Sequence, residues 1–115
     1  MANAQSKLTA DQLQLLKRKL EGERKRILGV LGAAGVTPAS ASPEERSEFE
    51  ETAQRTAEEN DQLEIAERER VLLAEVEQAL ENLRSGNYGV DEETGESIPY
   101  ERLLAIPWAR RRVDE

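Results

Sequence analysis

The chain has 115 residues, of which 35% are charged and only 3% aromatic, and its formal net charge is −8. A chain of this length forms one small domain, or a small domain with an elongated appendage. With so few large side chains it cannot bury much core in a sphere, which favours the appendage. It contains no cysteine and no histidine, which excludes disulfides, ordinary structural zinc sites, and thiol or imidazole catalysis.

The first predicted helix covers residues 10–31. Thr9 and Gln12 have the spacing of a capping box at its start. Three glycines after residue 28 weaken the helix progressively, so we expect it to end near Leu31. A stripe along one helix face repeats at intervals of three, four and seven residues. It consists of Leu13, Leu16, Leu20, Ile27 and Leu31.

The second predicted helix covers residues 43–84. Ser42 is placed to cap it, Pro43 occupies the first helical position, and Glu45 the third. The Ser-Gly-Asn run after residue 84 is a stop signal. The apolar seam of this helix steps mostly by three, four or seven residues, as in a coiled coil. It consists of Phe49, Ala53, Thr56, Leu63, Ala66, Leu73, Val76, Leu80 and Leu83.

Charge is distributed unevenly along the chain. Residues 1–42 hold seven Lys or Arg and three Asp or Glu, residues 43–84 hold five and fourteen, and residues 85–115 hold four and seven. A basic helix beside an acidic one favours an antiparallel pair, whose narrow apolar seam suits this composition. Disorder is the competing interpretation, and the apolar periodicity speaks against it. The acidic excess argues against direct DNA binding.

The residue pattern is no longer that of a long helix after Gly86. Residues 87–90 and 97–100 are candidates for two short strands joined by a turn, and residues 101–106 for one or two helical turns before a proline. We expect a minor core in this segment, in which Trp108 packs rather than forming a surface hot spot. Its members are Tyr88, Ile98, Leu103, Ile106 and Trp108.

This C-terminal segment resembles the zinc-finger signature of the DksA/TraR family. The family pattern has Tyr-Gly, two Cys-x-x-Cys pairs and, between the pairs, Ile, Arg-Leu and Ala-x-Pro. The same spacing is present here in Tyr88-Gly89, Ile98, Arg102-Leu103, Ala105 and Pro107. The four cysteine positions hold Asp91, Thr94, Arg112 and Glu115. These side chains cannot form a tetrahedral thiolate site. The resemblance therefore implies a finger-like module without zinc, held by packing and by a charge pair such as Asp91 with Arg112.

The resemblance extends backward to the tip of a helical hairpin. The family has Asp-x-x-Asp-x-Ala there, and at the same distance before the Tyr-Gly dipeptide this chain has Glu48, Glu51 and Ala53. In the family the tip carboxylates enter the secondary channel of RNA polymerase, near Mg²⁺ and basic side chains. The resemblance implies that place for Glu48 and Glu51, which share one helix face. Glutamates near a helix N-terminus are also common for their interaction with the helix dipole.

Three basic runs have two interpretations each. For Lys17-Arg18-Lys19 and Arg24-Lys25-Arg26, a solvated face that complements the acidic helix is favoured. The alternative is contact with polymerase or with guanosine tetraphosphate, an alarmone to which members of the family often respond. Arg110-Arg111-Arg112 either contacts polymerase or keeps the tail soluble.

Catalysis and membrane insertion find no support in the sequence. There is no glycine-rich phosphate loop or nucleophile elbow, and a two-helix rod offers no pocket that would separate the pKa values of paired carboxylates. No stretch is apolar for long enough to span a bilayer, and the N-terminus lacks the apolar core of a signal peptide. We therefore expect a cytoplasmic protein that is not an enzyme, has no cofactor or metal, and binds no membrane.

These observations predict a mainly α protein. Residues 1–84 form a long antiparallel two-helix coiled-coil hairpin with its tip within residues 32–53, and residues 85–115 form the zinc-free finger-like module. The implied function is a bacterial regulator, expected to be a monomer, that binds RNA polymerase through the secondary channel and modulates transcription initiation. Two alternatives stay open: a coiled-coil adaptor that dimerises or binds another helix, and a degenerate relative that occupies the channel without acting on initiation.

Overall fold

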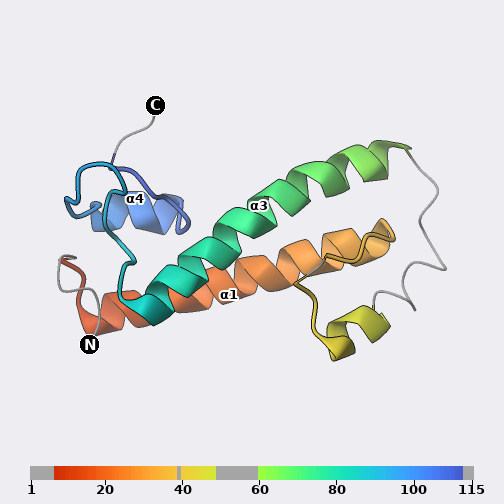
Figure 1. Ribbon diagram of the computed structural model, residues 1–115, viewed down its shortest axis with the longest axis horizontal. Coiled ribbons are helices and arrows are strands. Elements are labelled where there is room, and N and C mark those ends of the chain that lie inside the picture. The colour runs from red at the N-terminus through yellow and green to blue at the C-terminus, as the bar shows by residue number, and fades with distance from the viewer. Residues whose placement is uncertain (1–6, 39, 49–59, 113–115) are drawn as a thin grey trace. The chain divides into compact units, whose positions relative to one another are not determined.

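The described part of the chain is mainly helical, as the sequence predicts. The computed structural model describes residues 7–38, 40–48 and 60–112. Helix α1 spans Ala10–Ala33, α3 spans Asn60–Ser85 and α4 spans Tyr100–Ala105 (Figure 1). Residues 43–48 form a further helical segment. The predicted continuation of this segment through residues 49–59 lies outside the described residues, so the prediction of one helix over residues 43–84 is not tested there.

Helix α1 begins with the predicted capping box. The Thr9 backbone N–H donates to Oε1 of Gln12 at 2.9 Å, and the Gln12 N–H donates to Oγ1 of Thr9 at 3.1 Å. Each bond satisfies an N–H group that has no partner within the first turn. The capping prediction is confirmed.

Both long helices end at a glycine in the left-handed region. Gly35 has a φ of +76° and Gly86 a φ of +83°. After each glycine the chain folds back, because the Val36 N–H donates to the Leu31 carbonyl at 2.9 Å and the Asn87 N–H to the Asn82 carbonyl at 2.8 Å. A side chain at these positions would strain the backbone, so glycine sets the ends. Helix α1 therefore runs two residues beyond the predicted Leu31.

The described residues fall into two compact units. Those up to Glu23 and from Glu75 onward form the first unit, and those from Arg24 to Ala74 form the second. The core of the first unit contains Leu16, Leu20, Val76, Ala79, Tyr88, Ile98 and Leu103. The core of the second unit contains Ile27, Leu31, Ala34, Ala41, Ala66 and Leu73. Among the described positions of the two predicted stripes, seven are buried, whereas Leu13, Leu80 and Leu83 are only partly buried.

The predicted burial of one seam residue, Leu63, is wrong. The side chain of Leu63 is 52% exposed, whereas Ala66 and Leu73 are buried. With a turn of 100° per residue, Leu63 lies at the edge of the face that these two residues occupy. The buried face of α3 therefore begins at Ala66 in the described residues, and Phe49, Ala53 and Thr56 of the predicted seam lie outside them.

The segment after α3 forms turns rather than the two short strands that the sequence suggested. Within the described residues the only β pairing is an isolated antiparallel bridge between Val90 and Ser97. Gly89, inside the first candidate strand, has a φ of +83°, which departs from the extended conformation of a regular strand. The pairing is therefore confined to a tight hairpin, which helix α4 follows.

The minor core of this segment forms around Tyr88. Tyr88, Ile98 and Leu103 are buried, and the Tyr88 hydroxyl donates to the Pro107 carbonyl at 2.8 Å. Burial raises the pKa of the Tyr88 hydroxyl well above its ordinary value, so this group stays a donor. Ile106 and Trp108 are only partly buried, and they flank the core that they were expected to join.

No helix in the described ranges combines the length and the apolar character that a membrane span requires.

Candidate functional site

The predicted acidic tip is described at one of its three residues. Glu48 is exposed and is the last described residue of the helical segment 43–48. Glu51 and Ala53 lie outside the described residues. The described part of the tip is therefore the helical segment that carries Glu48.

A reciprocal capping box starts this segment, as predicted from Ser42 and Glu45. The Ser42 N–H donates to Oε1 of Glu45 at 2.8 Å, and the Glu45 N–H donates to Oγ of Ser42 at 3.2 Å. Pro43 follows at the first helical position, where its missing N–H has no consequence. The helical segment is thus begun by local chemistry alone.

Arg24 on α1 holds the same glutamate from outside the segment. Its Nη1 lies 2.9 Å from Oε2 of Glu45, and its Nη2 lies 3.4 Å from Oε1. The two side chains are 26% and 24% exposed, so water screens this pair less than a pair on the open surface. The Arg24 guanidinium, and after it the Ser42 N–H, hold the pKa of the Glu45 carboxyl below its usual range. The start of the segment is thereby fastened to α1.

A second two-pronged pair lies within the same unit. Arg26 on α1 contacts Glu69 on α3, with Nη2–Oε1 at 2.9 Å and Nη1–Oε2 at 3.1 Å. The basic run at residues 24–26 therefore contacts acidic partners, as the solvated-face interpretation expects, whereas Lys17, Arg18 and Lys19 are exposed. The individual pairs were not predicted, because helical periodicity does not specify which charges meet across segments.

The second candidate region contains the positions that hold cysteine in the family pattern. Asp91 is 6% exposed, and three backbone N–H groups donate to its carboxylate. The donors to Oδ1 are Glu93 at 2.7 Å and Thr94 at 3.1 Å, and the donor to Oδ2 is Arg112 at 2.9 Å. The expected charge pair between Asp91 and Arg112 is replaced by this backbone hydrogen bond, because the Arg112 guanidinium contacts Glu96 instead, at 2.8 Å.

Arg110, Arg111 and Arg112, called the arginine triplet below, are all engaged. Arg110 lies 3.0 Å from Glu75 and 3.6 Å from Glu92, and Arg111 contacts Glu93. The Glu92 N–H also donates to the Arg110 carbonyl at 3.0 Å. The triplet therefore binds residues 91–96 of its own chain, called the acidic loop below. This contact was not predicted from the sequence.

The former cysteine positions do not fit a zinc ion. Both oxygens of Asp91 accept backbone N–H groups, the Arg112 side chain offers only donors, and the Thr94 hydroxyl accepts the Glu96 N–H at 3.2 Å. Zinc sites in proteins use thiolate, imidazole or free carboxylate ligands. Across the described ranges no three such side chains gather in one place, and Glu115 lies outside those ranges.

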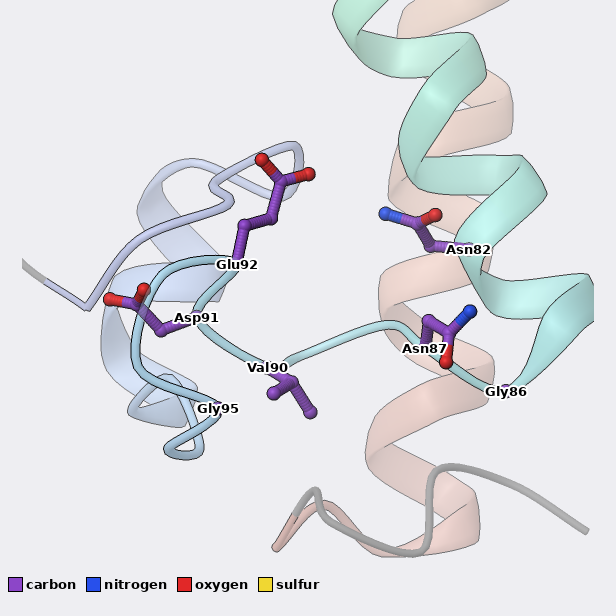
Figure 2. Close-up of a pocket in the computed structure, with 7 residues that line it drawn as sticks. All are labelled: Asn82, Gly86, Asn87, Val90, Asp91, Glu92 and Gly95. Carbon is purple, nitrogen blue, oxygen red and sulfur yellow. The ribbon is translucent and has the colours of Figure 1, made fainter.

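A cavity of about 520 Å³ lies between the end of α3 and the acidic loop. Figure 2 shows Asn82 and Asn87 on one side of it and Glu92 on the other, with the Asp91 carboxylate turned away from the two amides. Its lining residues are Asn82, Gly86, Asn87, Val90, Asp91, Glu92 and Gly95. This lining contains no nucleophile with an adjacent base, so it has the parts of a polar recess and not of an active site.

Comparisons with known proteins were made at the level of sequence and of fold. No protein-family model matches the chain. General stress protein 16O of Bacillus subtilis is 52% identical over 50 residues, which cover 44% of this chain and 31% of that protein. The RNA polymerase-binding transcription factor DksA of Caulobacter vibrioides is 33% identical over 106 residues, which cover 90% of this chain and 72% of that protein. The match to the stress protein thus spans less than a third of its length.

A solved structure matches over a similar extent. The transcription factor DksA2 from Pseudomonas aeruginosa has a TM-score of 0.59 and 32% identity, and the match covers 89% of this chain and 78% of that one. The similarity in sequence and the similarity in fold therefore each concern about nine tenths of the chain.

Proposed function

The chain belongs to the DksA/TraR family, and from this premise we propose that it binds RNA polymerase and modulates transcription initiation from within the secondary channel. The observation that carries the proposal is the 33% identity to an RNA polymerase-binding transcription factor over 90% of this chain. Identity at that level over so much of the chain indicates a common architecture, whereas a shared short motif would match over a few residues only.

The acidic tip would be the part that acts. Glu48 is exposed at the end of a helical segment whose start is fastened to α1 by Arg24 and Glu45. Glu51 follows at a spacing that places it on the same face of a continuing helix. In a channel that leads to Mg²⁺ and basic side chains, carboxylates act through charge and hydrogen bonds without binding the metal themselves.

The rest of the chain would position this tip. We propose that residues 1–84 form an antiparallel coiled-coil hairpin and that residues 85–115 form a finger-like module that docks at the rim of the channel. The protein would act as a monomer, without catalysis, and a polymerase partner implies the cytoplasm. Contact with polymerase or with guanosine tetraphosphate would fall to Lys17, Arg18 and Lys19, which are exposed, because Arg24 and Arg26 pair with glutamates of their own chain.

Competition for RNA polymerase tests the binding half of the proposal. Labelled full-length protein on core polymerase should be displaced by an established secondary-channel factor, and should displace it in turn. Binding without displacement would place the protein elsewhere on polymerase. Failure to bind at all would contradict the proposed function.

The tip is tested by substitution. The double variant Glu48→Ala and Glu51→Ala should bind polymerase as the unaltered protein does but lose its effect in a purified transcription assay over a panel of promoters. Glu44→Ala is the matched control, since Glu44 is an exposed glutamate of the same helical segment and should be dispensable. Equal loss in the control and the double variant would show a general effect of acidity and not a tip.

A coiled-coil adaptor is the second candidate, but the exposed apolar side chains on α3 argue against it. Leu63, Ile65 and Val71 are 52%, 43% and 61% exposed. These side chains point in different directions around the helix, so they do not form one stripe for a partner helix. Oligomerisation that depends on concentration, measured by sedimentation in the absence of polymerase, would support the adaptor.

A further inference from the structure

We propose that the carboxylate of Asp91 is the structural replacement for the zinc ion of the four-cysteine pattern, and that it closes the acidic loop of residues 91–96 onto the arginine triplet. A zinc ion holds its finger together by joining two short segments that are distant in sequence. In this chain one side chain performs that joining with hydrogen bonds.

The two carboxylate oxygens of Asp91 accept hydrogen bonds from different segments. Oδ1 accepts the N–H groups of Glu93 and Thr94, at 2.7 and 3.1 Å, and so shapes the turn in which Asp91 itself lies. Oδ2 accepts the N–H of Arg112 at 2.9 Å, across 21 positions of sequence. Only the second contact joins separate segments. Because Asp91 is buried, an unsatisfied oxygen there would be costly.

Neighbouring contacts hold the same two segments in register. The Glu92 N–H donates to the Arg110 carbonyl at 3.0 Å, one residue after Asp91 on the loop and two residues before Arg112 on the facing segment. Glu92, Glu93 and Glu96 on the loop contact Arg110, Arg111 and Arg112 in the same order. These ion pairs are largely exposed, and each contributes little by itself. They align the segments, and Asp91 joins them in a buried position.

Charged groups lie near Asp91 on the acidic loop and on the facing segment of residues 110–112. The loop contributes the three glutamates, and the facing segment contributes the three arginines. Glu75 on α3 pairs with Arg110 at 3.0 Å, and Arg102 on α4 donates to the Arg111 carbonyl at 2.8 Å. The Arg112 N–H, followed by those of Glu93 and Thr94, holds the pKa of the Asp91 carboxyl below its ordinary value. The carboxylate therefore stays charged, and an acceptor only, at neutral pH.

The sign of the acid response follows from this lowered pKa. A group whose pKa is lower in the folded state stabilises that state above its unfolded pKa, which is about 3.9 for aspartate. The contribution is lost as the pH falls through the folded value. The closure should therefore lose stability as the pH falls below about 4, and it should be indifferent to chelators and to thiol oxidants.

Amide hydrogen exchange of the full chain, followed by NMR, tests the proposal at the contact itself. In Asp91→Asn the amide keeps one oxygen for the turn and presents its NH₂ group to the Arg112 N–H, so the joining bond is lost. We expect the exchange rate of the Arg112 amide, relative to that of Leu16 in the same sample, to rise on the order of tenfold or more. The Leu16 reference removes any change in global stability.

Glu96→Gln is the matched control, because it removes the exposed ion pair of Arg112 and leaves Asp91 in place. Its relative exchange rate should change by at most about threefold. An Asp91→Asn protein whose Arg112 amide exchanges as slowly as in the unaltered chain would overturn the proposal. So would faster exchange of that amide in the unaltered protein on addition of EDTA, since a metal would then be holding the module.

Discussion

Arg24 contacts both carboxylate oxygens of Glu45, at 2.9 and 3.4 Å, while the same carboxylate caps its own helix through the Ser42 N–H. One glutamate thus begins the helical segment that carries Glu48 and fastens it to α1. The Arg24–Glu45 contact therefore positions the start of the segment on α1, and the residues that would form the tip follow it in the sequence.

Removal of the Arg24 guanidinium should therefore affect the tip more than the fold. In Arg24→Gln we expect a loss of stability of about 0.5–1 kcal/mol, because the pair is only partly shielded. The effect on transcription should weaken while polymerase binding persists. Urea unfolding, polymerase binding and a purified transcription assay measure the three quantities.

Arg26→Gln is the matched control for that substitution. It removes an equally two-pronged pair from the same helix, at 2.9 and 3.1 Å from Glu69, but one that leads to α3 and not to the segment that carries Glu48. Its stability should fall by a similar amount with transcription activity intact. If the two variants lose transcription activity equally, Arg24 has no special role in positioning Glu48.

The Glu45 carboxylate should also make stability depend on pH. Its pKa is lowered in the folded protein, first by Arg24 and then by Ser42, so it stabilises the fold above about pH 4.3 and loses that contribution as the pH falls further. Glu45→Gln should flatten this part of the curve, because glutamine preserves the capping box but not the charge. Urea unfolding between pH 3 and 7 measures it. Parallel curves for both proteins would contradict the assignment.

Glycine substitutions give a prediction whose sign depends on backbone conformation alone. A Cβ atom at Gly22, Gly29 or Gly95 would meet nothing within 4 Å. Gly22 and Gly29 lie inside α1, where alanine should stabilise the protein by about 1 kcal/mol each. Gly95 has a φ of +78°, and alanine there should destabilise it by about 1–2 kcal/mol.

Thermal unfolding of the three single variants decides this prediction. Destabilisation by alanine at Gly22 or Gly29 would contradict this prediction, because it would mean that another group packs closely against α1 at these positions. Normal stability with weaker polymerase binding would instead locate a close approach of the partner on the outer face of α1.

The sequence predicts those features that depend on neighbours within one or two helical turns. The capping boxes of Thr9 with Gln12 and Ser42 with Glu45 form as the spacing indicates, because both partners lie in one turn. The stripe of Leu16, Leu20, Ile27 and Leu31 is buried for the same reason. Helical periodicity is a local property, and a solvated opposite face does not disturb it.

Features that join distant segments were not predicted correctly. The contact of Asp91 with the Arg112 backbone was expected as a side-chain ion pair, and the preference of Arg112 for Glu96 could not be read from charge alone. Asp91 lies two and three residues from its turn donors, Glu93 and Thr94, and 21 from Arg112. Spacing indicates the turn, but only the fold shows which backbone group comes close enough to the second oxygen.

The same contact predicts that a metal site can be restored. Asp91 and Arg112 stand at two former cysteine positions, one in each pair, and the Asp91 carboxylate already lies 2.9 Å from the Arg112 backbone nitrogen. The variant with Asp91→Cys, Thr94→Cys, Arg112→Cys and Glu115→Cys should therefore bind one zinc ion and lose the finger fold when zinc is removed. Zinc titration against a chromophoric chelator and native mass spectrometry measure the binding.

The variant with only Asp91→Cys and Thr94→Cys is the control for this restoration. It has a single Cys-x-x-Cys pair and should hold zinc far less tightly, since a structural site needs four ligands. Equal zinc affinity in the two variants would show that the second pair does not reach the metal, and that the correspondence of Arg112 and Glu115 with the family's cysteines is wrong. Tight binding by the four-cysteine variant alone would show that the loop and the arginine triplet keep the arrangement of a zinc finger.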